Sequence, residues 1–266
     1  MRFEQFITDT LKRAGVIANR YCRKKLSVSY KSVQEVVTRA DYESERIIAG
    51  MIKKSFPTHS IWSEEKIRIK RKSEYCWYID PIDGTNNYFR SIPIWGISLA
   101  LYKGAVPVAG GMLFPLENEL YYAEANKGAY LNGKKLHVSK IRTLKDAVFV
   151  LDDISHLDAV KSSNESLSSF SKNFFQLRIF GAACYTYALL AKGAIDACFH
   201  QNLKPGDFAA GKLLVKEAGG LVEEVRREEI GMNKKTTILA SNRKLHDKIR
   251  KFLLKKEETN FINKKT

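Results

Sequence analysis

The sequence has 266 residues, of which 44% are hydrophobic, and its formal net charge at pH 7 is +16. This length and apolar content exclude a disordered chain and predict a globular protein with a sizeable buried core. The excess of lysine and arginine favours an anionic partner, such as a phosphorylated small molecule, a nucleic acid or a membrane surface.

The four cysteines are scattered, without the paired spacing of a zinc site or a disulfide framework. Reduced thiols of this kind are typical of cytoplasmic proteins. The N-terminal residues include an early acidic side chain and no apolar block, and no apolar run reaches the length of a membrane span. The sequence therefore predicts a cytoplasmic protein that makes no membrane contact.

Two amphipathic helices are predicted in the first sixty residues. Apolar side chains recur at helical spacing from Phe3 to Tyr21, and a second helix is expected from Thr38 to Phe56, before Pro57. Thr38 and Asp41 have the spacing of a capping box, which places the Asp41 carboxylate in the first turn of the second helix.

Short strands dominate the following part of the chain. Ile61-Trp62 is expected to end at the pair Glu64-Glu65, and Cys76 to Ile79 is expected to end at Asp80. Alternating apolar residues continue the strands from residue 95 to residue 130, and Asn132-Gly133 predicts a tight hairpin.

Strands and helices alternate in the second half, after a polar and ambiguous stretch over residues 152–172. Strands are expected at 178–180, 195–199, 221–225 and 237–240, and helices at 182–192, at 207–218 and from about residue 242. We expect an α+β half, residues 1–145, and an α/β half, residues 146–266, within one structural unit. A cleft between two halves is a common place for a ligand site.

Acidic residues stand where predicted strands end or helices begin: Asp41, Glu64-Glu65, Asp80, Asp83 and Asp207. Carboxylates without cysteine or histidine beside them suit Mg²⁺ or Mn²⁺ rather than Zn²⁺. Two or more such ions stabilise the attacking and leaving oxygens of a phosphoryl transfer. Taken singly, each acid is better explained without a metal: Asp41 or Asp207 as a charge at a helix N-terminus, and Glu64-Glu65 as an exposed turn.

The segment Asp80–Thr85, DPIDGT, is the most specific of these signals. Two carboxylates so close together repel each other, and the pKa of one rises unless a cation neutralises both. Gly84 and Thr85 follow, and their backbone N–H groups can bind a phosphate if a helix begins there. The segment therefore predicts a cation-dependent phosphate site.

These motifs resemble those of the inositol monophosphatase family of metal-dependent, lithium-sensitive phosphatases. The resemblance extends along nearly the whole chain, through VVTRAD, WSEE, WYIDPIDGTNNY, NKGAYLNGKKLHVS, FGAACYTYALLAKGAIDACF and LKPGDFAAGKLLVKEAGG. It is most similar to the bacterial subgroup of the extragenic suppressor SuhB. The resemblance implies a layered αβαβα sandwich of mixed α+β and α/β class, as in the metal-dependent sugar phosphatases, and a homodimer.

The resemblance also implies a cofactor, two to three Mg²⁺ ions, and the residues that hold it. Ligands of the first ion correspond to Glu64, Asp80 and the carbonyl of Ile82, and those of the second to Asp80, Asp83 and Asp207. A weaker third ion would lie near Glu64. The catalytic residues implied are Thr85 and Asp41, which orient the attacking water, together with Glu64. The implied substrate contacts are Gly84, Thr85, Gly181, Ala182 and His200.

Three positions depart from the family pattern. Gly206 stands where the family usually has tryptophan, so looser packing at Asp207 is expected. His200 and Gln201 stand where the family often has an acid that holds substrate hydroxyls, and His200 is equally well explained as a core histidine. The stretch from Leu151 lacks the usual Gly- and Pro-containing segment.

The leading hypothesis is a Mg²⁺-dependent phosphomonoesterase that hydrolyses a small sugar or inositol phosphate with a metal-activated water. Alternative substrates are a 3′-phosphoadenosine nucleotide, fructose bisphosphate and histidinol phosphate. A regulatory factor that binds RNA polymerase or RNA is the alternative of another class. The basic run Lys66–Lys72 is predicted to be a loop near the mouth of the site, which either attracts anionic ligands or is simply solvated.

Overall fold

The computed structural model describes residues 2–22, 24, 28–31, 36–152, 170–226 and 235–253. Its helices are α1 (Phe3–Tyr21), α2 (Arg39–Ser55), α3 (Thr85–Phe89), α5 (Ala183–Ala191) and α6 (Pro205–Glu217), and a 3-10 turn spans Leu144–Asp146. Residues 170–173 and 246–253 are also helical. No helix within these ranges combines the length and the apolar character needed to span a membrane.

Within the described ranges, the strands form three sheets. A small hairpin pairs β1 (Val28–Tyr30) with β2 (Val36–Thr38). The eight-stranded sheet has the order β10 (Lys134–Lys135), β9 (Gly128–Leu131), β8 (Glu119–Glu124), β7 (Val106–Phe114), β6 (Gly96–Lys103), β5 (Tyr75–Asp83), β3 (Ser60–Ser63) and β4 (Arg68–Ile69). The five-stranded sheet has the order β12 (Gln176–Arg178), β11 (Val148–Asp152), β13 (Ala197–Leu203), β15 (Thr236–Ser241) and β14 (Leu221–Arg226).

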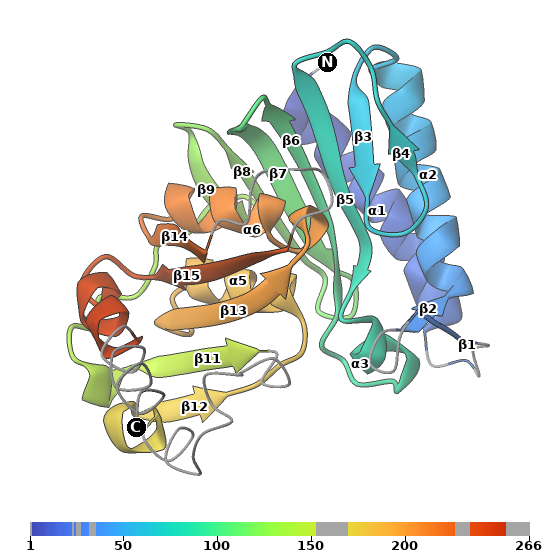
Figure 1. Ribbon diagram of the computed structural model, residues 1–266. Helices are drawn as coiled ribbons and strands as arrows, with labels where there is room; N and C mark the ends of the chain where they lie inside the picture. The colour runs from blue at the N-terminus through green and yellow to red at the C-terminus, as the bar shows by residue number, and fades with distance from the viewer. Residues whose placement is uncertain are drawn as a thin grey trace, which may run out of the picture.

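Helices and sheets alternate in five layers (Figure 1). Helices α1 and α2 pack on one face of the eight-stranded sheet, and α5 and α6 lie between its other face and the five-stranded sheet. The helical residues 170–173 and 246–253 pack beyond the five-stranded sheet, where Phe170 and Ile249 join Phe149 in an apolar core. The αβαβα architecture expected from the sequence is confirmed.

The local sequence signals explain why the first elements form. The apolar face of α1 buries Phe6, Ile7 and Leu11 against the sheet, and each such side chain contributes about 1.5–3 kcal/mol on burial. The predicted capping box is present at the start of α2, with the Asp41 carboxylate accepting from the backbone N–H of Thr38. Asn132-Gly133 forms the predicted hairpin turn between β9 and β10.

Several element boundaries differ from the predictions, and β13 runs from Ala197 to Leu203 rather than over residues 195–199. β5 does not end before Asp80 but continues to Asp83, because it pairs with β6 on both sides of a bulge at these residues. α6 begins at Pro205, since a proline fits the first turn of a helix, where no N–H donor is needed. β12 lies two residues before the predicted strand. The ambiguous stretch 152–172 falls mostly outside the described residues.

Candidate active site

Three of the predicted carboxylates meet at one point of the fold. Glu64 directly follows β3, Asp80 lies near the end of β5, and Asp207 lies in the first turn of α6. Each residue offers one carboxylate oxygen, and these three oxygens lie within 4.8 Å of one another. The sequence places these residues far apart, so the convergence depends on the packing of α6 against the eight-stranded sheet.

Backbone hydrogen bonds fix each member of this acidic cluster, which we define as Glu64, Asp80 and Asp207. The N–H of Glu64 donates to the carbonyl of Ile79 at 3.0 Å, which continues the parallel pairing of β3 with β5. Asp80 Oδ1 accepts from the N–H of Ile82 at 3.1 Å. Asp207 Oδ2 accepts from the N–H of Lys204 at 2.7 Å, as in a capping box.

The acidic cluster fits a divalent cation. Asp80 is only 1% exposed, and burial raises its pKa together with the negative charges of Glu64, Asp83 and Asp207. Burial and the negative charges of Glu64 and Asp83 also raise the pKa of Asp207. Hard oxygen ligands without sulfur or imidazole suit Mg²⁺ or Mn²⁺, and a bound cation removes the mutual repulsion of these carboxylates.

Two lysines that the sequence analysis did not assign lie beside Glu64. The ammonium of Lys204 lies 3.2 Å from Glu64 Oε1, and that of Lys31 lies 3.4 Å from the same oxygen and also pairs with Glu65. Lys204 stands three residues before Asp207 in LKPGD, and this position could have predicted that it lies near the acidic cluster. Lys31 follows β1, and nothing local connects it to Glu64.

Asp83 is placed differently from the acidic cluster, although the sequence analysis grouped it with the metal ligands. Its Oδ1 accepts from the N–H of Ala183 at 3.1 Å, and its Oδ2 accepts from the N–H of Cys184 at 2.9 Å. Burial raises the pKa of Asp83 to about 6, although these hydrogen bonds oppose the rise. Asp83 thus ties β5 to the N-terminus of α5, and its part in metal binding remains a prediction.

Thr85 and Asp41 form the pair that the sequence analysis expected. The Thr85 hydroxyl lies 3.2 Å from Asp41 Oδ1 and donates at 2.9 Å to the carbonyl of Ile82. Asp41 Oδ2 is used for the capping box, where it accepts from Thr38, so that Oδ1 remains for Thr85. Burial raises the pKa of Asp41 to about 6. The pair spans α2 and the turn that leads into α3.

The structure brings three of the predicted substrate contacts, Gly84, Gly181 and Ala182, into one region. Gly84 has φ +82°, and a Cβ built on it would lie 2.9 Å from the Cβ of Ala182. Gly181 also adopts a left-handed conformation, with φ +68°. The turn before α3 therefore touches the segment before α5, and only glycine gives the clearance and the φ angle that Gly84 needs.

His200, the remaining predicted substrate contact, is buried in β13 with 1% exposure. Its Nδ1 lies 3.6 Å from Asp152 Oδ2, and its ring packs 5.3 Å from that of Tyr187. These surroundings favour the alternative of a core histidine, and a substrate contact remains a prediction. Asp152 was missed, although it shows the same signal of an acid at the end of a strand.

Gly206 is packed tightly, contrary to the expectation of loose packing at this position. A Cβ built on Gly206 would lie 2.8 Å from the carbonyl oxygen of Ile79 and 3.2 Å from the ring of Trp62. Trp62 is 1% exposed, so its indole fills this part of the core. The position therefore has no room for a side chain.

The basic run Lys66–Lys72 is not a free loop. Arg68 and Ile69 form β4 on the edge of the eight-stranded sheet, and the Arg68 guanidinium stacks 4.1 Å from the centre of the Trp62 ring. Lys66 lies 4.0 Å from the ring centre of Tyr42. Arg68 also donates to the backbone carbonyl of Glu64 at 3.1 Å, which places the run beside the acidic cluster.

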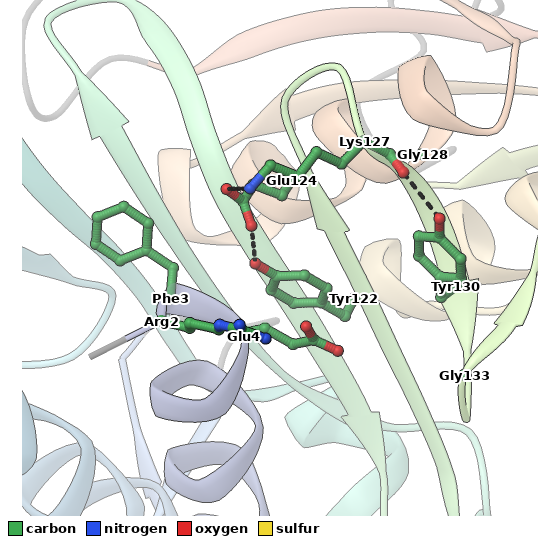
Figure 2. Close-up of a pocket in the computed structure, with 9 residues that line it drawn as sticks. All are labelled: Arg2, Phe3, Glu4, Tyr122, Glu124, Lys127, Gly128, Tyr130 and Gly133. Carbon is green, nitrogen blue, oxygen red and sulfur yellow. Dashed lines mark hydrogen bonds and ion pairs between the residues drawn. The ribbon is translucent and has the colours of Figure 1, made fainter.

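A cavity of about 670 Å³ lies elsewhere, between the start of α1 and residues on and around β8 and β9 (Figure 2). Its polar groups bind one another, since Tyr122 donates to Glu124 at 2.9 Å and Glu124 pairs with Lys127. None of the predicted site residues lines this cavity. The chemistry of the acidic cluster, rather than the size of a cavity, therefore locates the candidate active site.

Comparisons with known proteins identify the family of the chain. The family model of the inositol monophosphatase family matches residues 2–257. A fructose-1,6-bisphosphatase/inositol-1-monophosphatase of Aquifex aeolicus is 35% identical over 84% of this chain and 84% of its own length. The Nus factor SuhB of Pseudomonas aeruginosa is 36% identical over 75% of this chain and 76% of its own. The solved inositol monophosphatase of Thermotoga maritima superposes with a TM-score of 0.86 at 30% identity, covering 97% of this chain and 99% of that one.

These comparisons, together with the five-layer fold, define a phosphoric monoester hydrolase. The chain belongs to the inositol monophosphatase family.

Proposed function

We propose that the chain is a Mg²⁺-dependent phosphomonoesterase that hydrolyses a small sugar or inositol phosphate. The observation that carries this proposal is the convergence of the acidic cluster beside the Thr85–Asp41 pair. The ligands that we propose for two to three Mg²⁺ ions are Glu64, Asp80, the carbonyl of Ile82, Asp83 and Asp207. When bound, Mg²⁺ supplies positive charge that stabilises the transferring phosphoryl group and makes a water molecule more acidic.

The proposed roles of the protein groups follow from their hydrogen bonds. The Thr85 hydroxyl donates its proton toward Ile82 and Asp41, so its lone pairs are left to accept a hydrogen bond from the attacking water. With a pKa of about 6, Asp41 is mostly ionised near neutral pH and can accept a proton there. Glu64 is the third catalytic residue that we propose, because its carboxylate belongs to the acidic cluster.

The substrate class is tested by measuring phosphate release with Mg²⁺ from a panel of phosphate esters. The panel includes inositol 1-phosphate, fructose 1,6-bisphosphate, a 3′-phosphoadenosine nucleotide and histidinol phosphate. The name of the Aquifex aeolicus relative favours the first two. Hydrolysis of one ester well above the others supports the proposal and identifies the class, whereas no hydrolysis of any ester contradicts it.

A second candidate function is that of a regulatory factor that binds RNA polymerase or RNA. It is favoured by the relative named Nus factor SuhB and by the net charge of +16. Binding of the protein to RNA polymerase and to RNA at increasing salt concentrations tests this candidate. Specific binding that Asp80→Asn leaves unchanged would show a function separate from hydrolysis.

Family membership also supports proposals about the assembly, location and inhibition of the protein. We propose a homodimer that resides in the cytoplasm and is inhibited by Li⁺. Sedimentation at micromolar concentration tests the dimer, and a Li⁺ titration of phosphate release at fixed Mg²⁺ tests inhibition. A monomer, or a rate that Li⁺ does not change, contradicts the respective proposal.

A further inference from the structure

Asp152 binds a segment that lies about thirty residues further along the chain. It ends β11 and is 5% exposed. Its Oδ1 accepts from the N–H groups of Phe180 at 2.7 Å and Gly181 at 3.0 Å. Its Oδ2 accepts from the hydroxyl of Thr186 at 3.1 Å and lies 3.6 Å from His200 Nδ1. Both oxygens of Asp152 are thus occupied with the segment that leads into α5 and with the neighbouring strand.

A second carboxylate holds the other end of the same segment. Asp83 accepts from the N–H groups of Ala183 and Cys184. In the sequence, Ala182 stands between the residues whose N–H groups donate to Asp152 and those whose N–H groups donate to Asp83. Its own N–H donates to neither carboxylate. Ala182 also touches Gly84, the residue before Thr85. The amide of Ala182 is therefore fixed from both sides beside the turn that carries the catalytic threonine.

The conformation of this segment depends on such fixation. Gly181 has φ +68°, and glycine loses more conformational freedom than other residues when it is held in one geometry. Asn87 adds one further bond, from its side-chain amide to the carbonyl of Phe180 at 2.8 Å. Without an acceptor at position 152, the N–H groups of Phe180 and Gly181 would lose their partner within the protein, and the turn that these two hydrogen bonds hold would relax toward other conformations.

We propose that Asp152 is a positioning residue that presents the Ala182 amide to an oxygen of the phosphorylated substrate. This inference rests on the proposed phosphatase function. Asp152 touches neither the acidic cluster nor the Thr85–Asp41 pair, so its removal acts on substrate binding rather than on metal binding.

The decisive experiment compares Asp152→Ala, Asp152→Asn and Asp196→Ala with the wild type. Asp196 is a matched control, because it is also a buried aspartate of the same sheet region and accepts from the N–H of Val148 at 2.7 Å and from Ser139. Asp152→Ala is expected to raise KM about tenfold, which corresponds to the loss of one or two hydrogen bonds. The kcat should change less than about twofold. The Kd for Mg²⁺ in calorimetry should stay unchanged. Asp152→Asn, which keeps one acceptor oxygen, should restore most of the affinity.

An unchanged KM in folded Asp152→Ala overturns the proposal, as does an equal rise of KM in Asp196→Ala. Amide hydrogen exchange does not depend on phosphatase activity. It therefore tests the role of Asp152 separately from the proposed function. The N–H groups of Phe180 and Gly181 should exchange at least about tenfold faster in Asp152→Ala, and at the wild-type rate in Asp196→Ala. If the wild type hydrolyses no ester, the phosphatase proposal fails. Inorganic phosphate with Mg²⁺ then serves as the binding probe, and equal phosphate affinity in wild type and Asp152→Ala overturns the role of Asp152.

Discussion

The indole of Trp62 lies against Gly206, and this contact sets the distance between α6 and the eight-stranded sheet. A Cβ at Gly206 would approach the carbonyl oxygen of Ile79 to 2.8 Å and the Trp62 ring to 3.2 Å. In the sequence, Asp80 directly follows Ile79, and Asp207 directly follows Gly206. Glu64 stands two residues after Trp62. The contact therefore controls how closely the three carboxylates approach one another.

Gly206→Ala is expected to weaken both the fold and the metal site. The added methyl group must displace backbone rather than a flexible side chain, and overpacking of this kind costs about 1–3 kcal/mol. Chemical denaturation in EDTA should show this loss in the free energy of unfolding, and calorimetry should show a higher Kd for Mg²⁺.

Gly50→Ala is the control for this substitution. Gly50 lies in α2, and a Cβ there would meet nothing within 4 Å. Alanine should stabilise the helix by about 0.5–1 kcal/mol and leave Mg²⁺ binding unchanged. Wild-type stability and Mg²⁺ affinity in Gly206→Ala would show that the contact does not set the geometry of the acidic cluster.

Thr85→Val tests the role of the hydroxyl with little change in side-chain shape. Loss of the group that orients the attacking water should lower kcat by about 10²-fold or more, while the Kd for Mg²⁺ stays the same. Thr85→Ser keeps the hydroxyl and should retain a rate within about tenfold of the wild type. If Thr85→Val keeps the wild-type rate, or loses no more activity than Thr85→Ser, the hydroxyl is not the group that orients the attacking water.

The stability of the metal-free protein should depend on pH through its buried carboxylates. Burial raises the pKa of Asp41 to about 6 and that of Glu65 to about 7. The folded state therefore binds more protons than the unfolded state between about pH 4 and these values, so that unfolding becomes easier as pH rises through this window. Mg²⁺ at the acidic cluster would add positive charge beside Asp41 and Glu65, which favours their ionised forms and should oppose this loss.

Thermal unfolding at several pH values measures this effect. The difference between the Tm with Mg²⁺ and the Tm in EDTA should grow from pH 5 to pH 7.5. A difference that stays constant over this range would mean that bound Mg²⁺ does not influence the titration of these carboxylates.

The sequence predicted the parts of the fold that depend on local signals. The periodicity of α1, the capping box of Thr38 and Asp41, and the Asn132-Gly133 turn each involve residues close together in the chain. The acidic motifs also indicated the site before the structure brought the acidic cluster together.

Contacts between distant segments could not be predicted in the same way. The carboxylate of Asp83 binds amides that follow it by 100 and 101 residues, and Asp152 binds amides 28 and 29 residues away. No pattern within the sequence specifies which backbone N–H groups will donate hydrogen bonds to a given carboxylate. The tight packing of Gly206 was missed for the same reason, because Trp62 contacts it from β3 in the eight-stranded sheet.

The basic run next to the acidic cluster should assist the capture of anionic substrates. Lys70, Arg71 and Lys72 are exposed, and their replacement by glutamine should lower kcat/KM at low salt with little change in kcat. The effect should shrink near 0.15 M salt, where the Debye length is about 8 Å. Arg68→Gln should in addition lower stability by about 0.5–1 kcal/mol, because it removes the stacking on Trp62. A loss that does not vary with salt would indicate direct contact with the substrate.

Phosphate release by the wild type and by Asp80→Asn, each with Mg²⁺ and with excess EDTA, tests the central claim most directly. Asp80 is the most buried member of the acidic cluster, and asparagine preserves its shape while removing its charge. We predict turnover only for the wild type with Mg²⁺, and loss of at least about 10³-fold in the other three reactions. Wild-type rates in EDTA, or in Asp80→Asn with Mg²⁺, would contradict a metal-dependent phosphatase centred on this cluster.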